Sequence, residues 1–473
     1  MREPSSRPVV AVVGGGVSGL AAAHRVQQLL PTAEVVVLEA SPRIGGSLRT
    51  AEVAGLVTDV GAESILNRRP EGVDLAREVG LGDDLVHPAT ITASLWNRGR
   101  LVPMPRTLMG VPLDLHGLDD VLSAKGRARA AMDAVLPQTE LGDRDVSVGH
   151  LVEERLGKEV VDRLVEPLLG GVYAGHAREI SARAAVPQLV AKLGQDRSLM
   201  HAAAAATRPP DSTAAPVFAG LRGGVGRLPG ELARAAGATI RTGATVRELA
   251  RRPDGGWSLV VGPTRDLELV LADAVVLATP ARATSRLLAD AAPASALALG
   301  RVEYASMAIV TLAVASAAFP EVPGSGFLVP PVDGHAVKAS TFSFAKWDWV
   351  REAGAGASDP VVILRCSLGR HREEQTLQRT DEELVGLALR DLTDAIGLSV
   401  RPVDTHVQRW GGALPQYAVG HLDRVSSIRA ELARLPGIAV CGSAYDGVGI
   451  PACIASAHLA AAEVVEDLAT MGP

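Results

Sequence analysis

Apolar residues along the chain form short continuous runs and longer periodic stretches. Residues 9–13 and 34–39 are continuous runs, which are typical of buried strands, and residues 19–30 between them have helical periodicity. This order of strand, helix and strand predicts half of a doubly wound α/β fold. Further buried strands are expected at 274–278 and 438–441, the latter followed by an alanine-rich helix from Pro451. The α/β part should therefore be assembled from distant pieces of the chain.

The segments between these pieces have other patterns. Residues 104–200 have helical periodicity and few strand signals, and we expect helices at 118–135 and 148–169. Residues 239–271 predict a hairpin with a glycine-containing turn. Residues 301–370 alternate strand-like runs with Gly/Pro loops, which indicates a separate antiparallel sheet.

Composition narrows the class of partner. The 473 residues include 47 Lys and Arg against 53 Asp and Glu, so the net charge is −6 and no positive field attracts nucleic acid. The three cysteines are scattered, with no metal-ligand spacing, so we expect no metal site and a reducing compartment. The amino terminus lacks the features of a secretory signal, and no apolar run reaches the length of a membrane span. We expect a cytoplasmic protein and leave a peripheral membrane contact open.

A glycine motif follows the first strand. Gly14, Gly16 and Gly19 have the GxGxxG spacing between a strand and a helix, where backbone amides can meet a pyrophosphate. Glu39 lies twenty residues after Gly19, at the end of the second strand, where a carboxylate can accept hydrogen bonds from ribose hydroxyls. A second glycine pair at Gly45-Gly46, beside arginines, suits a cofactor held deeply. These features predict a dinucleotide-binding site and favour FAD over exchangeable NAD as its ligand.

Several motifs resemble one known family. The run 39–46 (EASPRIGG) resembles the superfamily of flavin-containing amine oxidases, phytoene desaturases and protoporphyrinogen oxidases. Further stretches are similar to the porphyrinogen oxidases, in particular the Gram-positive-type branch that acts on coproporphyrinogen III. They are 61–64 (GAES), 103–105 (PMP), 166–175 (EPLLGGVYAG), 414–421 (LPQYAVGH) and 442–451 (GSAYDGVGIP).

The resemblance implies a fold class and a domain organisation. We expect an α/β protein in which a Rossmann-type FAD-binding domain is discontinuous, accompanied by an antiparallel-sheet substrate domain and a helical insertion. The FAD-binding domain is assigned to 1–82, 217–285 and 433–473. The substrate domain is assigned to 83–103, 201–216 and 286–432, and the insertion, which should line the substrate cavity, to 104–200.

The resemblance also implies noncovalent FAD and its contacts. Core packing is the alternative role for Val246 and for Trp410, whereas the glycines permit close backbone approach. The expected cofactor-binding residues are Gly14, Gly15, Gly16, Val17, Ser18, Gly19, Glu39, Ala40, Gly46, Ser47, Gly61, Ala62, Glu63, Ser64, Val246, Trp410, Gly447, Val448, Gly449 and Ile450.

The implied activity is oxygen-dependent oxidation of a porphyrinogen to a porphyrin with release of hydrogen peroxide, in haem biosynthesis. Coproporphyrinogen III carries four propionates, so cations are expected at the cavity mouth, and Arg68 and Arg69 are candidates. Leu168, Gly171 and Tyr173 are expected to line the cavity. A downstream haem-pathway enzyme is a further candidate partner. The catalytic residue stays unassigned, because hydride transfer needs orientation more than a strong base.

Other functions are kept open at this point. The protein could prefer protoporphyrinogen IX, or it could be a flavin amine oxidase, although its carboxy-terminal segment has only Tyr445 where such enzymes have an aromatic pair. A noncatalytic flavoprotein that binds tetrapyrroles is the third alternative. His421 and Tyr417 are tempting as acid or base groups, but a structural role is the more common one for such residues.

Overall fold

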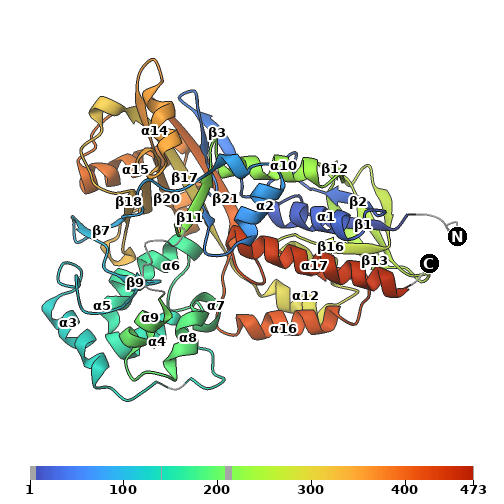
Figure 1. Cartoon of the computed structure of the whole chain (residues 1–473), viewed down its shortest axis with the longest axis horizontal. Coiled ribbons are helices and arrows are strands. Elements are labelled where there is room, and N and C mark those ends of the chain that lie inside the picture. Colours follow the sequence, from blue (N-terminus) through green and yellow to red (C-terminus); the bar gives the residue numbers. More distant parts are fainter. Residues whose placement is uncertain (1–6, 140, 208–215, 472–473) are drawn as a thin grey trace.

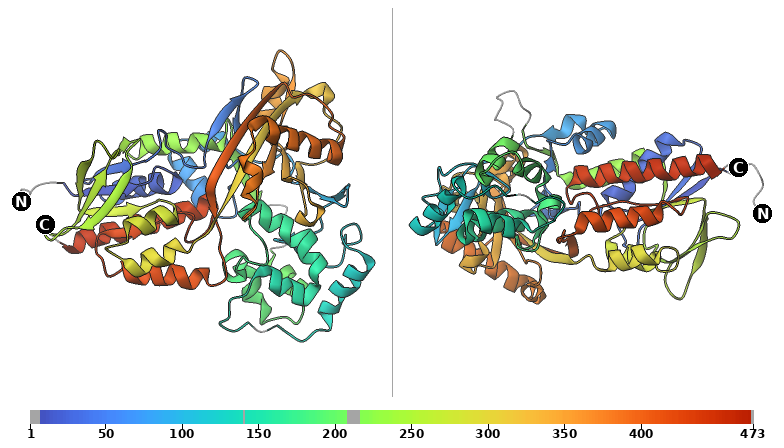
Figure 2. Two further views of the ribbon diagram at one scale, coloured as in Figure 1. Left: turned by 180° about the vertical axis from the view of Figure 1, so that it is seen from behind. Right: turned by 90° about the horizontal axis from the view of Figure 1, so that it is seen from below.

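The computed structural model describes residues 7–139, 141–207 and 216–471. The parts of the expected domains at 1–6, 208–215 and 472–473 lie outside the described residues. Figure 1 shows a layered α/β region at the end of the molecule that carries both termini, with a strongly twisted sheet and a cluster of helices at the opposite end. The view from behind in Figure 2 shows the same division.

The α/β region is built on a five-stranded parallel sheet with the order β12-β2-β1-β16-β22. The expected apolar runs supply most of it. The strands are β1 (Val9–Val13), β2 (Glu34–Leu38), β12 (Thr239–Arg241), β16 (Ala274–Leu277) and β22 (Ile438–Val440). The discontinuous α/β assembly is therefore confirmed.

One strand departs from the prediction. β12 was expected in a hairpin, but it pairs in parallel with β2 and so extends the main sheet. The antiparallel hairpin is limited to β13 (Val246–Arg251) and β14 (Trp257–Val261), which β15 (Glu268–Ala272) extends. The apolar pattern of residues 239–241 did not distinguish the two kinds of pairing.

Helices cover both faces of the parallel sheet. On one face, α1 (Val17–Leu29) packs along α17 (Ile450–Met471), and buried alanines of both helices, such as Ala22 and Ala457, share one core. α2 (Glu71–Glu78) and α10 (Leu228–Ala235) join this layer. On the other face lie α11 (Ala281–Leu287), α12 (Pro293–Gly300), α16 (His421–Leu432) and the β13-β14-β15 sheet.

The second domain contains a seven-stranded sheet with the order β21-β17-β20-β19-β18-β7-β8. Its strands are β7 (Ser94–Asn97), β8 (Arg100–Pro103), β17 (Tyr304–Ala315), β18 (Gly326–Leu328), β19 (Val337–Phe342), β20 (Val361–Leu368) and β21 (Asp404–Pro415). All neighbours are antiparallel except β18 and β7. α15 (Asp381–Ile396) packs against one face of this sheet, and the other face is turned toward α6 (Glu166–Tyr173).

Shorter elements connect these layers. β3 (Thr50–Val53) and β4 (Leu56–Asp59) form a hairpin, and β11 (Phe218–Leu221) pairs with β5 (Ile65–Leu66) and β6 (Leu85–Val86). α13 (Ser343–Lys346) and α14 (Asp348–Ala355) lie between β19 and β20.

The helical region also differs from its prediction in detail. It contains α3 (Ala124–Ala131), α4 (Val148–Leu156), α5 (Lys158–Val160), α6, α7 (Ala182–Ala185), α8 (Pro187–Leu193) and α9 (Leu199–Ala206), besides the short pair β9 (Thr107–Leu108) and β10 (Val111–Pro112). A single helix over 148–169 is wrong, because Gly157 adopts a φ of 92° and residues 161–165 form a π-helical turn. A helix from 118 is also wrong, because the Ser123 side chain caps α3 by accepting the Gly126 amide.

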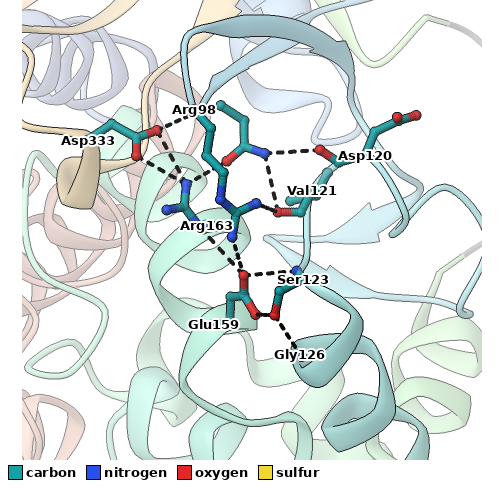
Figure 3. A network of polar contacts seen from close by, with 9 residues as sticks. Arg98, Asp120, Val121, Ser123, Gly126, Glu159, Arg163 and Asp333 are labelled. Carbon is teal, nitrogen blue, oxygen red and sulfur yellow. Dashed lines mark hydrogen bonds and ion pairs between the residues drawn. The ribbon is translucent and has the colours of Figure 1, made fainter.

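A polar network ties the helical region to the edge of the seven-stranded sheet (Figure 3). Arg163, in the π-helical turn, pairs with Asp333 at 3.1 Å and donates to Asn97 Oδ1 at 2.6 Å. Arg98 pairs with Glu159 in the same network. The side chains of Arg163 and Asp333 are only 12% and 11% exposed, so their partners are not readily replaced by water.

We predict that Arg163→Met lowers the free energy of unfolding by about 2 kcal/mol, because it leaves Asp333 and Asn97 without a charged donor. The control is Arg77→Met, which removes an ion pair whose side chains are 61% and 63% exposed and should cost at most about 1 kcal/mol. Urea unfolding measures both values. Equal losses in the two variants would contradict the proposed contribution of the network.

Among the described residues, no helix combines the length and the apolar character that crossing a membrane requires.

Candidate active site

The glycine turn after β1 has a shape that requires small residues. Gly14 adopts a φ of 108°, and a Cβ atom there would lie 2.7 Å from the Ala278 carbonyl oxygen. A Cβ atom at Gly19 would collide with the Gly14 carbonyl oxygen. At Gly16, in contrast, a Cβ atom would have no protein atom within 4 Å. The turn therefore leaves open space directly before α1.

The amino terminus of α1 faces this space, and the amides of Val17 and Ser18 in its first turn have no acceptor among the described residues. Gly16 is the N-cap residue and supplies no side-chain acceptor, and the first turn, which includes Val17 and Ser18, contains no acidic residue. Unpaired amides at a helix amino terminus bind phosphate oxygens and favour negative charge. These residues therefore fit the pyrophosphate of a dinucleotide.

Glu39 lies beside this turn, at the end of β2. Its Oε2 accepts the Gly15 amide at 2.6 Å and its Oε1 accepts the Ser41 amide at 2.7 Å. The Glu39 carbonyl accepts the Ala244 amide, which brings Val246 into the same neighbourhood. Both carboxylate oxygens retain lone pairs for a ribose, so the geometry fits the predicted role.

The second glycine pair packs directly against the first motif. The Gly45 amide donates to the Gly15 carbonyl at 2.8 Å, and a Cβ atom at Gly46 would touch only Gly16 Cα, at 3.4 Å. Ala40, Gly46 and Ser47 are exposed at this surface. The two glycine segments thus form one continuous backbone cradle.

A third segment, residues 61–64, continues the cradle toward the seven-stranded sheet. The Ala62 amide donates to the Ser47 carbonyl at 3.2 Å. A Cβ atom at Gly61 would collide with that same carbonyl oxygen, so glycine is required there. Trp410 on β21 donates its indole N–H to the Val60 carbonyl at 3.0 Å, so its polar atom has a partner beside the 61–64 segment.

Glu63 is committed to protein partners. Its carboxylate accepts hydrogen bonds from Ser343 Oγ at 2.7 Å and Trp347 Nε1 at 3.0 Å, and it pairs with Arg365 at 2.9 Å. Lys346 Nζ lies 3.5 Å from it and donates to Ser64 Oγ at 2.8 Å. Burial alone would raise the pKa of Glu63, but Lys346, Arg365 and the two hydrogen bonds lower it to about 2. Its carboxylate therefore anchors the 61–64 segment to the second domain.

The carboxy-terminal segment closes the cradle. A Cβ atom at Gly442 would lie 3.7 Å from Ser18 Oγ, and Gly447 adopts a φ of 144° before α17 begins at Ile450. Val448 packs at the border of the core of the helical region. The predicted residues 447–450 thus connect the helix that packs on α1 with the helical region.

A cavity of about 170 Å³ lies beside this cradle, on the face of the seven-stranded sheet that is turned toward α6. Strands β17, β19 and β20 supply its floor and Gly171 supplies its α6 side. The lining residues are Gly171, Met307, Ile309, Lys338, Ala339, Thr341, Arg365 and Ser367. A second hollow of about 300 Å³, beside Trp410 and Arg409, shares Met307 with it.

The predicted lining residues are separated in the structure. Gly171 lines the cavity, whereas Tyr173 is 6% exposed and packs in the core of the helical region, 5.6 Å from the ring of Tyr417. Leu168 is half-buried on the same helix. Sequence reasoning missed Lys338, although a lysine inside an otherwise apolar strand is a signal that could have identified it.

The arginines predicted at the mouth also differ from one another. Arg69 forms a bidentate ion pair with Glu71 at 2.6 Å, so its guanidinium already has a carboxylate partner. Arg68 is exposed.

His421 and Tyr417 have structural contacts. The His421 ring is fully buried, stacks on Tyr417 at 3.9 Å, and its Nε2 lies 3.1 Å from the Tyr445 carbonyl oxygen. Tyr417 donates to the Ser443 carbonyl at 2.5 Å. Burial lowers the pKa of His421, so it stays neutral near pH 7. These contacts hold the 443–445 segment against α16.

The cradle and the cavity beside it define a flavoprotein site, and comparison with known proteins agrees. The chain belongs to the flavin containing amine oxidoreductase family, whose model matches residues 17–465. It is therefore an FAD-dependent oxidoreductase, as the glycine motifs and the resemblance predict.

Similar proteins span nearly the full length of the chain. A coproporphyrinogen III oxidase of Mycobacterium tuberculosis is 38% identical over 97% of this chain and 97% of its own length. One from Bacillus subtilis is 32% identical over 94% and 95%. A crystal structure from Exiguobacterium sp. 255-15 superposes with a TM-score of 0.85 and 30% identity, covering 98% and 99% of the two chains. The predicted kinship with the porphyrinogen oxidases is thereby confirmed.

Proposed function

We propose that this protein oxidises coproporphyrinogen III to coproporphyrin III in haem biosynthesis, with oxygen as the electron acceptor. Each porphyrinogen loses six electrons and six protons, which reduce three molecules of oxygen to three of hydrogen peroxide. The flavin supplies, when bound, a two-electron acceptor that is used once in each of three rounds.

The observation that carries this proposal is the position of the cavity beside the cofactor cradle. Arg365 lines the cavity and also donates to the Gly61 carbonyl in the cradle. Met307 borders both the cavity and the hollow beside Trp410. An apolar ring that enters between them would therefore lie next to the segments that we expect to bind the flavin.

The chain's own contribution is orientation and exclusion of water. The methylene carbon of a porphyrinogen carries no acidic proton, so no basic side chain is assigned to it. Met307 and Ile309 supply an apolar wall, and the missing side chain of Gly171 leaves space for one edge of the ring. The names and near-full-length coverage of the Mycobacterium and Bacillus relatives support the same substrate class.

An amine oxidase activity has less support. Tyr445, the single aromatic residue of the carboxy-terminal segment, is 1% exposed and packs in the core between the hairpin sheet and α16. An aromatic side chain that received an amine would have to border the cavity. Protoporphyrinogen oxidation stays the closest alternative, and it is distinguished by substrate preference.

Two measurements on the purified protein test the proposal. We expect a higher kcat/KM for coproporphyrinogen III than for protoporphyrinogen IX, followed by porphyrin fluorescence. We also expect about three hydrogen peroxide molecules per porphyrin, as six electrons require. A preference for protoporphyrinogen would overturn the substrate assignment. Porphyrin formation without peroxide would contradict the role of oxygen as the electron acceptor.

Arg68 is proposed to contact a propionate at the cavity mouth. Arg68→Ala should raise KM for coproporphyrinogen about tenfold, the loss of one charge-assisted hydrogen bond, and should affect protoporphyrinogen less. Arg69→Ala should have a smaller effect, because Arg69 already pairs with Glu71. The exposed Arg390 on α15 provides the control, Arg390→Ala. Equal effects of Arg68→Ala on both substrates would remove its assigned role.

We propose that the FAD is noncovalent. Cys441 and Cys453, the cysteines nearest the carboxy-terminal segment, are buried, and burial raises the pKa of both thiols above the usual range, to about 11 for Cys453. Such thiols are poor nucleophiles near pH 7. Acid precipitation should therefore release the yellow chromophore into the supernatant. A yellow pellet would contradict a noncovalent cofactor.

The cellular context is part of the same proposal. We propose that the protein is cytoplasmic and contacts a membrane only peripherally. We also propose that it passes its product to a downstream enzyme of haem biosynthesis.

A further inference from the structure

Lys338 is a buried cation without a partner, and no role described so far uses it. It lies on β19, is 3% exposed, and borders the 170 Å³ cavity. Among the described residues, its Nζ has no hydrogen-bond partner. Burial and the neighbouring Arg370 lower the pKa of Lys338 to about 7. A lysine in this environment is costly to charge unless an anion joins it.

Lys338 lies at a β-bulge of β19. Val337 pairs with Leu368 and Ala339 pairs with Ser367, so Lys338 is the extra residue on β19. A bulge changes the direction of a side chain that regular alternation would otherwise fix, and bulges are frequent beside active sites. The Lys338 carbonyl accepts the Val329 amide at 3.0 Å, which holds the bulge in place.

Arg370 lies next to Lys338 and also has an unused donor. It is 5% exposed, and its Nη2 donates to the carbonyl of Val329, at 3.1 Å, the same residue whose amide donates to the backbone carbonyl of Lys338. Its Nη1 has no acceptor among the described residues. A Cβ atom at Gly170 of α6 would lie 2.7 Å from that Nη1, so glycine makes room for the guanidinium.

Among the described residues, no atom accepts a hydrogen bond from Lys338 Nζ or Arg370 Nη1. Glu373 and Glu166 are the acidic neighbours of Arg370, but neither accepts a hydrogen bond from its Nη1. The Glu166 carboxylate accepts the Ala177 amide at 3.1 Å and lies 3.7 Å from Arg178. Arg365, the other cation that lines the cavity, is already paired with Glu63. Lys338, which lines the cavity, and Arg370 next to it therefore bring free N–H donors together, and a carboxylate that entered there would accept hydrogen bonds from them.

The proposed substrate supplies such a group. Coproporphyrinogen carries a propionate on every pyrrole, so whichever edge enters the cavity brings a carboxylate with it. Protoporphyrinogen has vinyl groups on two pyrroles and can enter with an apolar edge. We propose that Lys338, assisted by Arg370, binds a propionate of the inserted edge and selects coproporphyrinogen over protoporphyrinogen. This inference rests on the proposed function.

The test compares Lys338→Met, Lys338→Arg and the control Lys125→Met, which removes an exposed lysine of α3. Lys338→Met should fold and retain FAD, because it replaces an unpaired buried cation with an apolar side chain of similar length. It should raise KM for coproporphyrinogen about tenfold or more, and change KM for protoporphyrinogen by less than about threefold. Lys338→Arg should restore most of the preference.

Equilibrium binding of coproporphyrin III and protoporphyrin IX, followed by porphyrin fluorescence, provides a second readout that needs no turnover. The dissociation constant of coproporphyrin should rise about tenfold in Lys338→Met and that of protoporphyrin should not. Equal changes for both porphyrins, or none, would overturn the role of Lys338. Failure of the wild type to oxidise either porphyrinogen would instead overturn the proposed function, while the binding measurement still decides the inference.

Discussion

Gly16→Val is expected to give a folded protein that has lost its FAD. A valine fits the polypeptide, because Gly16 has an ordinary φ of −74° and a Cβ atom there meets no protein atom within 4 Å. The same side chain would occupy the space before α1 where we expect the pyrophosphate, and would block the approach of the backbone amides.

The measurement is the flavin-to-protein ratio after purification, with circular dichroism to verify the fold. Gly386→Val is the matched control, because Gly386 lies on α15 and a Cβ atom there also meets open space. The control should retain its flavin fully. Full retention in Gly16→Val would remove the glycine turn from the cofactor site.

Glu63→Gln is expected to lower the free energy of unfolding by about 3–5 kcal/mol, the usual cost of removing one partner of a buried ion pair. The side chains of Glu63 and Arg365 are 10% and 8% exposed, and Lys346 is the second cation on the same carboxylate. Neutralising Glu63 leaves both cations facing each other without a counter-ion. Because this contact joins residues 61–64 to the second domain, flavin retention should also decrease.

The pH dependence of stability gives an independent check of this ion pair. The pKa of Glu63 is lowered from its ordinary value of 4.5 to about 2 in the folded protein. The folded state therefore holds this proton less tightly, and the stabilisation is complete above pH 4.5 and is lost as the pH falls through about 2.

Urea unfolding of wild type and variant between these pH values measures the effect. The difference between them should shrink toward low pH, whereas Glu52→Gln, at an exposed residue of β3, should follow the wild type throughout. A difference that is independent of pH would mean that the Glu63 charge is not the stabilising feature.

The parts of the fold that rest on local pattern could be predicted from the sequence. The apolar residues 9–13 form a buried strand, and the turn from Gly14 to Gly19 needs glycines because a Cβ atom at Gly14 or Gly19 would collide with the backbone. Both features are visible in the local sequence. Pairing partners were harder. Residues 239–241 suit a hairpin and a parallel edge equally well, and the choice of β2 as neighbour depends on contacts between distant segments.

The site shows the same limit. The cofactor motifs are contiguous, so Glu39 and the glycines could be recognised in the sequence. The cavity is formed by residues of β17, β19 and β20 and by one glycine of α6, which no local pattern brings together. The β-bulge at Lys338 depends on the register of β19 against β20, which the sequence does not show. Likewise, only the structure shows that the Arg69 side chain turns toward Glu71 and pairs with it.

The most direct test of the account is anaerobic mixing of the purified yellow protein with coproporphyrinogen III, followed by the visible absorption of the flavin. An oxidase should lose this absorption as the first two electrons pass to the flavin, and admission of oxygen should restore the yellow colour, release peroxide and allow coproporphyrin fluorescence to rise over the remaining rounds. Flavin that stays oxidised while the porphyrinogen binds would contradict the account and indicate a flavoprotein that only carries tetrapyrroles.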